Sequence, residues 1–383
     1  MPEAVIVATA RTPIGRAFKG SLKDYRADDL CAFIVAELMK KAPAVDPASV
    51  DDVIIGAANH AGEQSMNLAR NVAALAGLPD TVPGTTVNRF CASSLQSIRM
   101  AFHAIKAGEG DTFVAGGVES VTRTGGKGFD KEDANPRFLD KERPDYVNQM
   151  YIPMGFTAEN VAEQYGVSRE RMDEFACISQ NRAVEAQKNG FFEREITPVT
   201  LPDGTVVDKD DGPRPGTTVE KLAQLQPAFK PDGKVTAGNA CPLNDGAAAV
   251  LVMSEDKARA LGLTPLARIV ASAVSGLAPE IMGVGPIEAC RKVLAATGMS
   301  ISDIDVVELN EAFAAQVLPV CDEVGISIDD QLNPHGGAIA LGHPFGQTGA
   351  RIMTTLINDL QTLDKTWGLE TMCVGGGQGM AMI

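Results

Sequence analysis

Residues 84–118 read GTTVNRFCASSLQSIRMAFHAIKAGEGDTFVAGGV, and this stretch indicates the fold class. Its first part, 84–90, is rich in β-branched residues and predicts a strand that leads directly into Cys91. Residues 92–107 carry apolar side chains at helical spacing and stop at Gly108, which predicts a helix with a glycine end. Residues 111–118 predict a second strand. A strand, a helix and a further strand in this order are typical of an α/β protein.

The same alternation continues on both sides of this stretch. Further strands are expected at 4–9, 51–58, 246–253, 267–274 and 304–309, and helices at 27–41, 64–76, within 157–190 and at 286–297. Residues 195–208 predict a hairpin around Asp203-Gly204. Strands that alternate with helices favour a sheet rich in parallel pairs.

Short segments of the first half have counterparts in the second half. Asp52-Val53-Ile54 is matched by Asp305-Val306-Val307, Asn88 before Cys91 by Asn333, and Gly116-Gly117 by Gly375-Gly376. We therefore expect a duplicated α/β unit whose two halves bring their loops to one shared site. Residues 119–155 are polar and rich in charge, glycine and proline, so the middle of the chain is expected to be an insertion over this core.

The composition excludes several classes of protein. The 383 residues carry a formal charge of −15, which opposes binding to nucleic acid or to an anionic membrane surface. No apolar run approaches the ~20 residues of a membrane span, and the opening MPEAVIVATARTP lacks the features of a signal peptide. The seven cysteines are scattered, without a CxxC pair. We therefore expect reduced thiols and a cytoplasmic location.

Cys91 is the first candidate for chemistry. A cysteine between a strand and a helix lies where the helix N-terminus stabilises a thiolate, which would lower its pKa and make it a nucleophile. The alternative, which is commoner for a single cysteine, is a buried structural residue. Asn310, at the start of NEAFAA, could likewise hold a water or an oxyanion, although a helix N-cap is the simpler interpretation.

Two histidines and a further cysteine lie in glycine-rich turns near the C-terminus. His335 and His343 belong to residues 333–344, and a histidine of near-neutral pKa is the usual base for a cysteine nucleophile. A metal site is not favoured, because no third ligand has a recognisable spacing. Cys373 precedes Gly375-Gly376-Gly377, whose bare N–H groups suit an oxyanion hole. The simpler interpretation of His335 and His343 is loop residues satisfied by local carbonyls, and that of Cys373 is a core residue.

Other catalytic motifs are absent from the sequence. It contains no GxxxxGK[ST], no GxSxG and no HExxH, so the readings as a kinase, a serine hydrolase and a zincin lose support. The glycine run after Cys373 does not fit a dinucleotide-binding fingerprint, because no βαβ unit with a downstream acidic residue follows it.

Taken together, these motifs resemble the thiolase family over essentially the whole chain. The resemblance rests on NRFCASS (88–94), NEAFAAQ (310–316), NPHGGAIALGHPFGQTGAR (333–351) and CVGGGQGMA (373–381), with support from VATARTPIG (7–15), MGFTAENVA (154–162), VTAGNACPLNDGAAAV (235–250) and APEIMGVGP (278–286). It implies a duplicated five-layer αβαβα thiolase fold with an inserted loop domain. The implied division is an N-terminal core half at 1–118 completed by about 247–256, a loop domain at 119–246 and a C-terminal core half at 257–383.

The resemblance also implies a role for each motif residue. Cys91 would be the nucleophile that becomes acylated, His343 its base, and Cys373 a second acid/base that acts on the α-carbon of the acetyl-CoA unit. Asn310 would hold a water that forms one oxyanion hole with His343. The backbone N–H groups of Cys91 and Gly375 would form the other.

The resemblance further implies substrates and partners. Coenzyme A would be a co-substrate, with no permanently bound cofactor and no metal, and the chain would form a homodimer or homotetramer. Residues expected along the CoA and acyl groups are Arg214, Phe229, Cys241, Met154 and Phe313. Ser94, Pro153 and Cys241 depart from the common pattern, which leaves the acyl preference open. The resemblance runs to Ile383 and does not settle whether further C-terminal residues follow.

The implied activity is cleavage of 3-oxoacyl-CoA to acetyl-CoA and a shortened acyl-CoA. The NRFC and NPHGGAIALGHPFG variants resemble catabolic thiolases of actinobacterial lipid or steroid breakdown. Three alternatives stay open: a condensing 3-oxoacyl synthase, a biosynthetic acetyl-CoA acetyltransferase and a non-catalytic CoA-ester carrier. Asn310 and Cys373 argue against the synthase, which uses a cysteine and two histidines, and the intact set of four residues argues against the carrier.

Overall fold

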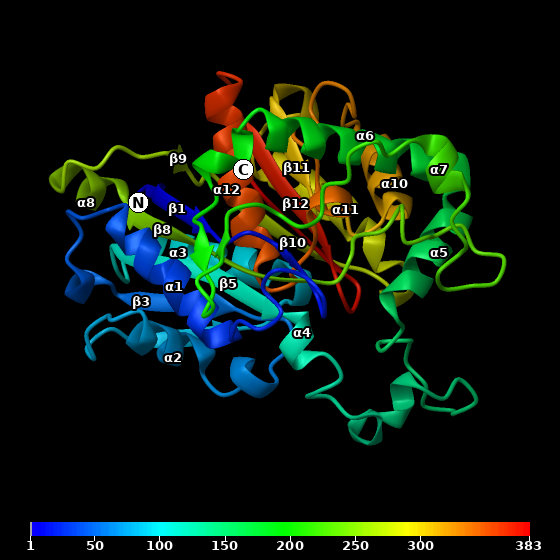
Figure 1. Cartoon of the computed structure of the whole chain (residues 1–383), viewed down its shortest axis with the longest axis horizontal. Helices are drawn as coiled ribbons and strands as arrows, with labels where there is room; N and C mark the ends of the chain where they lie inside the picture. The colour runs from blue at the N-terminus through cyan, green and yellow to red at the C-terminus, as the bar shows by residue number, and fades with distance from the viewer. Residues whose placement is uncertain (1) are drawn as a thin grey trace.

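Two mixed sheets form the centre of the molecule, as a computed structural model of residues 2–383 shows (Figure 1). The first has the order β4-β3-β5-β8-β1-β9, with β2 beside β8. The second has the order β10-β13-β12-β11. The first sheet comprises β1 (Ala4–Arg11), β2 (Gly15–Arg16), β3 (Asp52–Gly56), β4 (Gly84–Val87), β5 (Thr112–Ser120), β8 (Asn244–Ser254) and β9 (Ala267–Arg268). The second comprises β10 (Ser272–Gly276), β11 (Val306–Leu309), β12 (Gly368–Val374) and β13 (Gln378–Met382).

The strand order confirms the expected duplication. The order β3-β5-β8-β1 recurs as β11-β12-β13-β10, and in both sets the first pair is parallel and the other two are antiparallel. Even β4, which pairs in parallel with β3, has a counterpart in the isolated parallel bridge between Leu332 and Val307. Asp51 Oδ2 accepts the Thr112 N–H at 2.9 Å, and Asp305 Oδ2 accepts the Trp367 N–H at 2.8 Å. Asp305 therefore corresponds to Asp51, one residue before the match that the sequence indicated.

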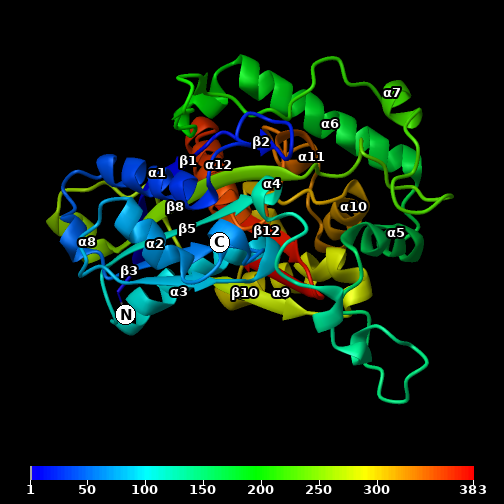
Figure 2. The same cartoon turned by 60° about the horizontal axis from the view of Figure 1, so that its bottom comes forward.

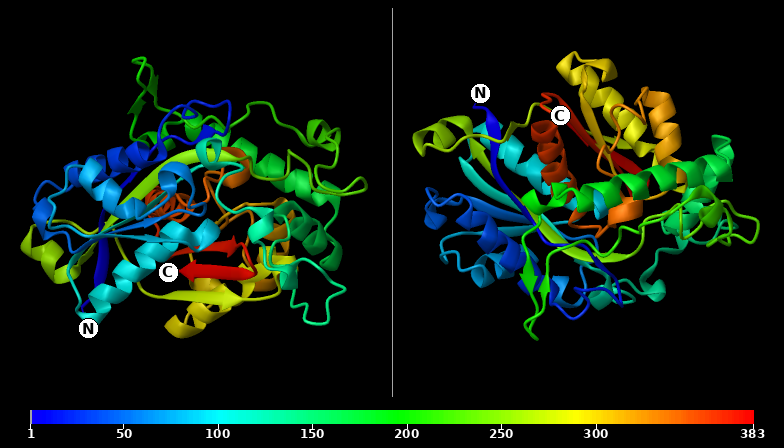
Figure 3. Two further views of the ribbon diagram at one scale, coloured as in Figure 1. Left: turned by 90° about the horizontal axis from the view of Figure 1, so that it is seen from below. Right: turned by 45° about the horizontal axis from the view of Figure 1, so that its top comes forward.

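Helices cover both sheets and separate them, which gives the expected five layers (Figure 3, right). The outer helices of the first sheet are α1 (Ala27–Lys40) and α2 (Leu68–Leu75), the central helices are α3 (Ser93–Ala107) and α12 (Thr348–Thr362), and the outer helices of the second sheet are α9 (Gly285–Thr297) and α10 (Ala314–Val324). Alternation along β1 explains the layering, since successive strand side chains point to opposite faces. Val5 and Val7 pack under α1 and α2, whereas Ala4 and Ile6 pack toward α3 and α12.

Some expectations about single elements are wrong. The sheets are mixed rather than rich in parallel pairs, because β8 and β13 each lie antiparallel between two neighbours. The strand expected at 267–274 is two strands, and the chain passes there from the first sheet into the second. The sequence does not reveal this crossing, because residues 267–274 form one mostly apolar run without a glycine or proline to mark a break. The helix expected at 64–76 begins only at Leu68.

Along the chain, the middle segment is inserted between β5 and β8, which are neighbouring strands of the first sheet. After β5, residues 121–243 form α4 (Val121–Thr124), α5 (Met154–Gln164), α6 (Arg169–Lys188), the predicted hairpin β6 (Val199–Thr200) and β7 (Val206–Val207), and α7 (Val219–Ala223). The part between α4 and α5 extends away from the rest (Figure 2). The remaining helices are α8 (Glu255–Ala260) and α11 (Ala338–Leu341). Among residues 2–383, no helix combines the length and apolarity that crossing a membrane requires.

A buried ion cluster joins β1 to the middle segment and yields a stability prediction. Arg11 is fully buried and lies 2.9 Å from Glu195 Oε1 and 2.8 Å from Asp210 Oδ1. Arg11→Met leaves two buried carboxylates without their cation, so we expect it to lower the unfolding free energy by about 3–5 kcal/mol in urea titrations. Lys23→Met removes an exposed ion pair with Asp24 and should change little. Equal midpoints for the two variants would contradict this role of Arg11.

Candidate active site

Four chain segments meet where the strands of both sheets end. Cys91 follows β4, Asn310 follows β11, Cys373 lies near the end of β12, and His343 lies in the loop between α11 and α12. The N–H of Asn310 donates to the Thr371 carbonyl at 3.0 Å, which continues the parallel pairing of β11 with β12. Loops that follow the carboxyl ends of parallel strands emerge at one edge of a sheet, so this pairing places the Asn310 and Cys373 segments side by side.

Cys91 lies in a 3₁₀ turn that leads directly into a helix. Strand β4 ends at Val87, a 3₁₀ turn covers Phe90–Ala92, and α3 begins at Ser93. Phe90 has a φ of 46°, an unusual value for a bulky residue. Its N–H donates to Asn88 Oδ1 at 2.8 Å, and its carbonyl accepts the Ser93 hydroxyl at 2.7 Å. These local bonds hold the strained turn that presents the sulfur.

The expected lowering of the Cys91 pKa is wrong for this structure. Burial raises the pKa of the Cys91 thiol to about 12, although the N–H groups of Gly375 and of Cys91 itself hydrogen-bond to the sulfur and act in the opposite direction. The sulfur is shielded from water, and its turn precedes α3 instead of forming its first turn. The Gly375 and Cys91 N–H groups are thus the backbone donors at the Cys91 sulfur.

His343 is held as a neutral base. Its ring is buried, and burial, with a smaller effect of Arg351, lowers the His343 pKa to about 3. Nδ1 lies 2.6 Å from the Thr348 hydroxyl oxygen. The single O–H of Thr348 donates a hydrogen bond to the Pro344 carbonyl at 2.8 Å. The hydroxyl oxygen therefore accepts a hydrogen bond from Nδ1–H, which leaves Nε2 unprotonated with its lone pair as an acceptor. Nε2 lies 3.3 Å from Asn310 Nδ2, and no hydrogen bond within residues 2–383 joins it to Cys91.

Asn310 is not the N-cap of a helix. Helix α10 begins at Ala314 with Phe313 as its N-cap, so the simpler interpretation of Asn310 is wrong. Its side chain points to His343 through Nδ2, and its Oδ1 is buried without a hydrogen-bond partner among residues 2–383. A buried polar atom of this kind ordinarily binds a protein group or a water.

Buried polar residues that sequence reasoning missed hold these loops in place. Asn244 Oδ1 accepts the His343 N–H at 3.0 Å, and Gly342, at φ 113°, leaves room for the Asn244 side chain. Glu119 accepts the Gly346 N–H at 2.9 Å, and Glu311 accepts the Ile339 N–H at 3.1 Å. The only sequence signal was the presence of Asn244 and Glu311 inside the family motifs, which did not reveal what they contact.

Ser94 and His335 each form hydrogen bonds away from the Cys91 and His343 side chains. Ser94 Oγ is buried and accepts the Ala350 N–H at 2.9 Å, so this departure from the family pattern belongs to the packing of α3 against α12. His335 Nδ1 lies 2.5 Å from Asp359, and its ring stacks on Phe191 at 3.5 Å between centroids. Neither contact involves His343.

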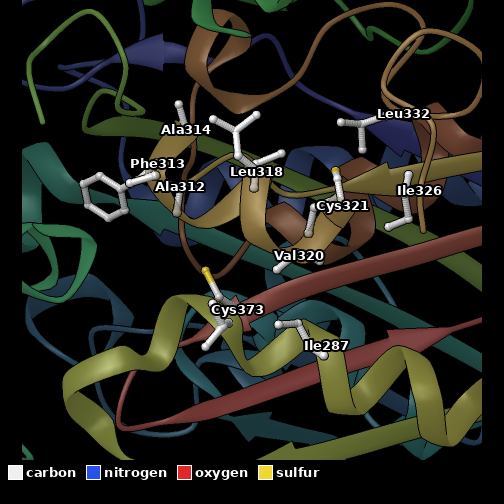
Figure 4. Packing of buried hydrophobic residues seen from close by; sticks show 14 of the residues in the cluster. Ile287, Ala312, Phe313, Ala314, Leu318, Val320, Cys321, Ile326, Leu332 and Cys373 are labelled. Atoms are coloured by element: carbon white, nitrogen blue, oxygen red, sulfur yellow. The ribbon is translucent and has the colours of Figure 1, made fainter. Parts of the chain in front are cut away.

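A second and a third thiol accompany Cys91. Burial raises the pKa of Cys373 well above its usual value, and the proximity of Cys91 and Cys241 raises it further. Burial also raises the Cys241 pKa. Figure 4 shows the Cys373 sulfur directed toward the segment that carries Ala312 and Phe313. Neutral thiols with raised pKa values are able to donate a proton, which fits an acid rather than a resident thiolate.

Four of the five residues expected along the CoA and acyl groups form one apolar surface. The ring of Phe229 packs on Gly155, next to Met154, and lies 6.2 Å from the Phe313 ring in an edge-on arrangement. The N–H of Cys241 donates to the Ala312 carbonyl at 3.0 Å, beside Phe313. Arg214 stands apart, since its side chain is exposed and makes no ion pair with residues 2–383.

The contact of Thr348 with His343 yields a prediction. Thr348→Val removes the oxygen that fixes the protonated Nδ1, so the imidazole loses its preferred tautomer and orientation. We expect kcat to fall about 10- to 100-fold, with little change in KM. Thr348→Ser keeps the hydroxyl and serves as the matched control. Equal kcat values for the valine and serine variants would contradict this role.

Comparisons with known proteins agree with this geometry. The family model "Thiolase, N-terminal domain" matches residues 4–256, and "Thiolase, C-terminal domain" matches residues 263–383. This chain belongs to the thiolase family. It is 47% identical over 400 aligned residues to a beta-ketoadipyl-CoA thiolase of Acinetobacter baylyi, covering 100% of this chain and 99% of the relative. It is 46% identical to a 3-ketoacyl-CoA thiolase of Bacillus subtilis, covering 100% of this chain and 98% of that one.

A solved structure has the same fold as this thiolase. The crystal structure of the Bacillus anthracis acetyl-CoA acetyltransferase superposes with a TM-score of 0.91 and 41% sequence identity, covering 100% of this chain and 98% of that chain. The five-layer arrangement expected from the sequence is therefore the thiolase fold.

Proposed function

We propose that this thiolase cleaves 3-oxoacyl-CoA with free CoA, giving acetyl-CoA and an acyl-CoA shortened by two carbons. The observation that carries the proposal is the convergence of the Gly375 and Cys91 N–H groups on the Cys91 sulfur, with a neutral His343 held by Thr348. The names of the Acinetobacter baylyi and Bacillus subtilis relatives support a 3-oxoacyl thioester as substrate.

In the first half-reaction, the Cys91 sulfur attacks the keto carbon of the substrate. His343 Nε2 takes the thiol proton during the attack, because both groups rest in their neutral forms. The keto oxygen becomes an oxyanion that the N–H groups of Cys91 and Gly375 stabilise.

Collapse of this intermediate breaks the bond between the α- and keto carbons. The electron pair leaves as the enolate of acetyl-CoA, whose oxygen is stabilised by His343 and a water on Asn310. The partnerless Oδ1 of Asn310 supports that water. Cys373 donates its proton to the enolate carbon, which yields acetyl-CoA and acyl-Cys91. The proton that His343 took from Cys91 then passes to the Cys373 thiolate, so both groups are neutral again before CoA enters.

In the second half-reaction, the CoA thiol attacks acyl-Cys91. His343 takes the proton of the entering thiol, and the same two N–H groups stabilise the second oxyanion. Cys91 leaves and recovers a proton, so the kinetics are ping-pong. The reverse sequence is a Claisen condensation.

The proposal extends to the loop domain at 119–246 between the core halves 1–118 and 257–383. Arg214 offers a cation for the CoA phosphates, while Met154, Phe229, Phe313 and Cys241 offer an apolar path for the pantetheine and acyl groups. A local cation of this kind is able to bind an anion despite a net charge of −15.

We further propose that the protein is a cytoplasmic homodimer or homotetramer that acts in lipid or steroid breakdown. The seven free cysteines support a reducing compartment.

The second candidate is a biosynthetic acetyl-CoA acetyltransferase, which runs the same chemistry toward acetoacetyl-CoA. The name of the Bacillus anthracis structure favours it. The carrier is disfavoured, because a carrier needs neither the hydrogen-bonded His343 nor the N–H groups at the sulfur.

Thiolysis of a panel of 3-oxoacyl-CoA esters tests the proposal. The panel runs from acetoacetyl-CoA through 3-oxoadipyl-CoA and a long-chain ester to a steroid-derived ester. We expect CoA-dependent turnover with a preference for esters longer than acetoacetyl-CoA. Turnover of acetoacetyl-CoA alone would favour the acetyltransferase. Stable binding of the esters without any turnover would overturn the enzyme assignment.

A further inference from the structure

Arg89, two residues before the nucleophile, makes an unusual set of contacts. Its guanidinium is half-buried, and both of its side-chain partners are neutral amides. Nε donates to Gln96 Oε1 at 2.9 Å, and Nη1 donates to Gln378 Oε1 at 2.9 Å. No carboxylate within residues 2–383 forms an ion pair with Arg89. Burial lowers the pKa of Arg89, which means that partial removal from water disfavours its charged form.

Gln378 links Arg89 to the glycine turn at residues 375–377. Its Nε2 donates to the Gly375 carbonyl at 3.2 Å, while its Oε1 receives Arg89. Gln378 pairs with Val374 across the hairpin of β12 and β13, so the three glycines 375–377 form its loop. Gly376 and Gly377 have φ values of 76° and 80°. Glycines have little conformational preference of their own, so this bond fixes the peptide plane that follows Gly375 and limits rotation about the Cα that also carries the Gly375 N–H.

The Gly375 N–H is the donor that reaches the Cys91 sulfur from the C-terminal half. The sulfur and Arg89 belong to the N-terminal half, and Gly375 and Gln378 belong to the other half. One continuous set of bonds therefore runs from Gln96 in α3 through Arg89 and Gln378 to Gly375.

We propose that Arg89 and Gln378 form a clamp that holds the Gly375 N–H at the oxyanion position above Cys91. Both are positioning residues for acyl transfer, and the inference rests on the proposed function. The fork of a guanidinium suits this task because it reaches two amide oxygens in fixed directions, which a lysine cannot do. The two donors of this oxyanion hole, the N–H groups of Cys91 and Gly375, come from different halves of the chain. The clamp fixes one donor relative to the other.

The clamp acts on some chemical steps and not on others. The Cys91 and Gly375 N–H groups stabilise the oxyanions of both acyl-transfer steps. Enolisation of acetyl-CoA uses Cys373, His343 and Asn310 instead. Loss of the clamp should slow acyl transfer and spare the exchange of the C2 protons of acetyl-CoA with solvent, whereas general damage to the fold would reduce both.

Four variants test the clamp in the full-length enzyme. Arg89→Met and Gln378→Leu each break it, and Gln378→Glu keeps an oxygen for Arg89 but loses the donor to Gly375. The double variant Arg89→Met/Gln378→Leu asks whether the two side chains act through one another. Arg99→Met is the matched control, because Arg99 is a half-buried α3 arginine that bonds across the halves to Ser272 at 3.2 Å and does not contact the glycine turn.

We expect kcat for thiolysis to fall about 10- to 100-fold in each single clamp variant, as for a misplaced oxyanion donor. KM and the exchange of acetyl-CoA C2 protons in D₂O should stay at wild-type values. The double variant should be no slower than the slower single variant, and Arg99→Met should behave as wild type.

Two results would overturn these conclusions in distinguishable ways. A wild-type protein without thiolysis and without proton exchange would overturn the proposed function. An active wild type whose clamp variants keep full thiolysis, or lose proton exchange in parallel with it, would overturn the clamp alone.

Discussion

Cys91→Ser is expected to lower kcat/KM for thiolysis by about 10⁴-fold or more. The hydroxyl is a weaker nucleophile than the thiol, and its proton is harder to remove in a buried site where even the thiol has a pKa of about 12. His343 has to remove this proton, and a serine hydroxyl holds its proton more tightly than a thiol does. The measurement is steady-state thiolysis of the best ester of the panel, together with the thermal unfolding of both proteins.

Cys31→Ser is the matched control for this variant. Cys31 is a fully buried thiol on α1, in the core on the outer face of the first sheet. Its replacement should lower stability and leave kcat unchanged. A Cys91→Ser enzyme within tenfold of wild type, or an equal loss in Cys31→Ser, would show that the Cys91 sulfur does not carry the acyl group.

Cys373→Ser is expected to separate the two halves of the chemistry. Serine cannot deliver the proton that the enolate carbon needs, so cleavage of 3-oxoacyl-CoA should fall about 10³-fold or more. Exchange of acetyl-CoA C2 protons with D₂O should fall in parallel. Transfer of an acyl group between acyl-CoA and labelled CoA should persist, because it uses Cys91 and His343 without any carbon acid.

Cys290→Ser controls for the loss of a buried thiol. Cys290 lies on α9 in the same apolar cluster as Cys373, and burial likewise raises its pKa to about 12. This variant should keep both reactions. If Cys373→Ser retained wild-type proton exchange, another group would have to act at the α-carbon.

The periodic parts of the fold could be predicted from the sequence. Strand β5 and helix α3 lie within a residue or two of their predicted positions, because a fully buried strand leaves a short apolar run and a helix leaves helically spaced apolar side chains. The split of 267–274 between two sheets left no such pattern. The antiparallel pairing of β8 depends on a chain that returns after more than a hundred residues, which no local signal records.

The candidate site shows the same division. Motifs indicated Cys91, His343, Asn310, Cys373 and Gly375 as candidates, and the structure adds contacts that involve all of them except Cys373. The direction of the Cys91 pKa could not be predicted, since local position favoured a low value and only the packed structure reveals the burial that outweighs it. Thr348, Asn244 and Gln378 were missed because their roles lie in single contacts to other loops.

The most direct measurement is a search for the acyl-enzyme itself. The protein is mixed with a 3-oxoacyl-CoA in the absence of free CoA, quenched in acid and digested, and its peptides are weighed. We expect one acetyl-CoA released per active site and an acyl group on the peptide that contains Cys91, which disappears when CoA is added. Release of acetyl-CoA with Cys91 unmodified, or an acyl group on another residue, would contradict the assignment of Cys91 as the nucleophile.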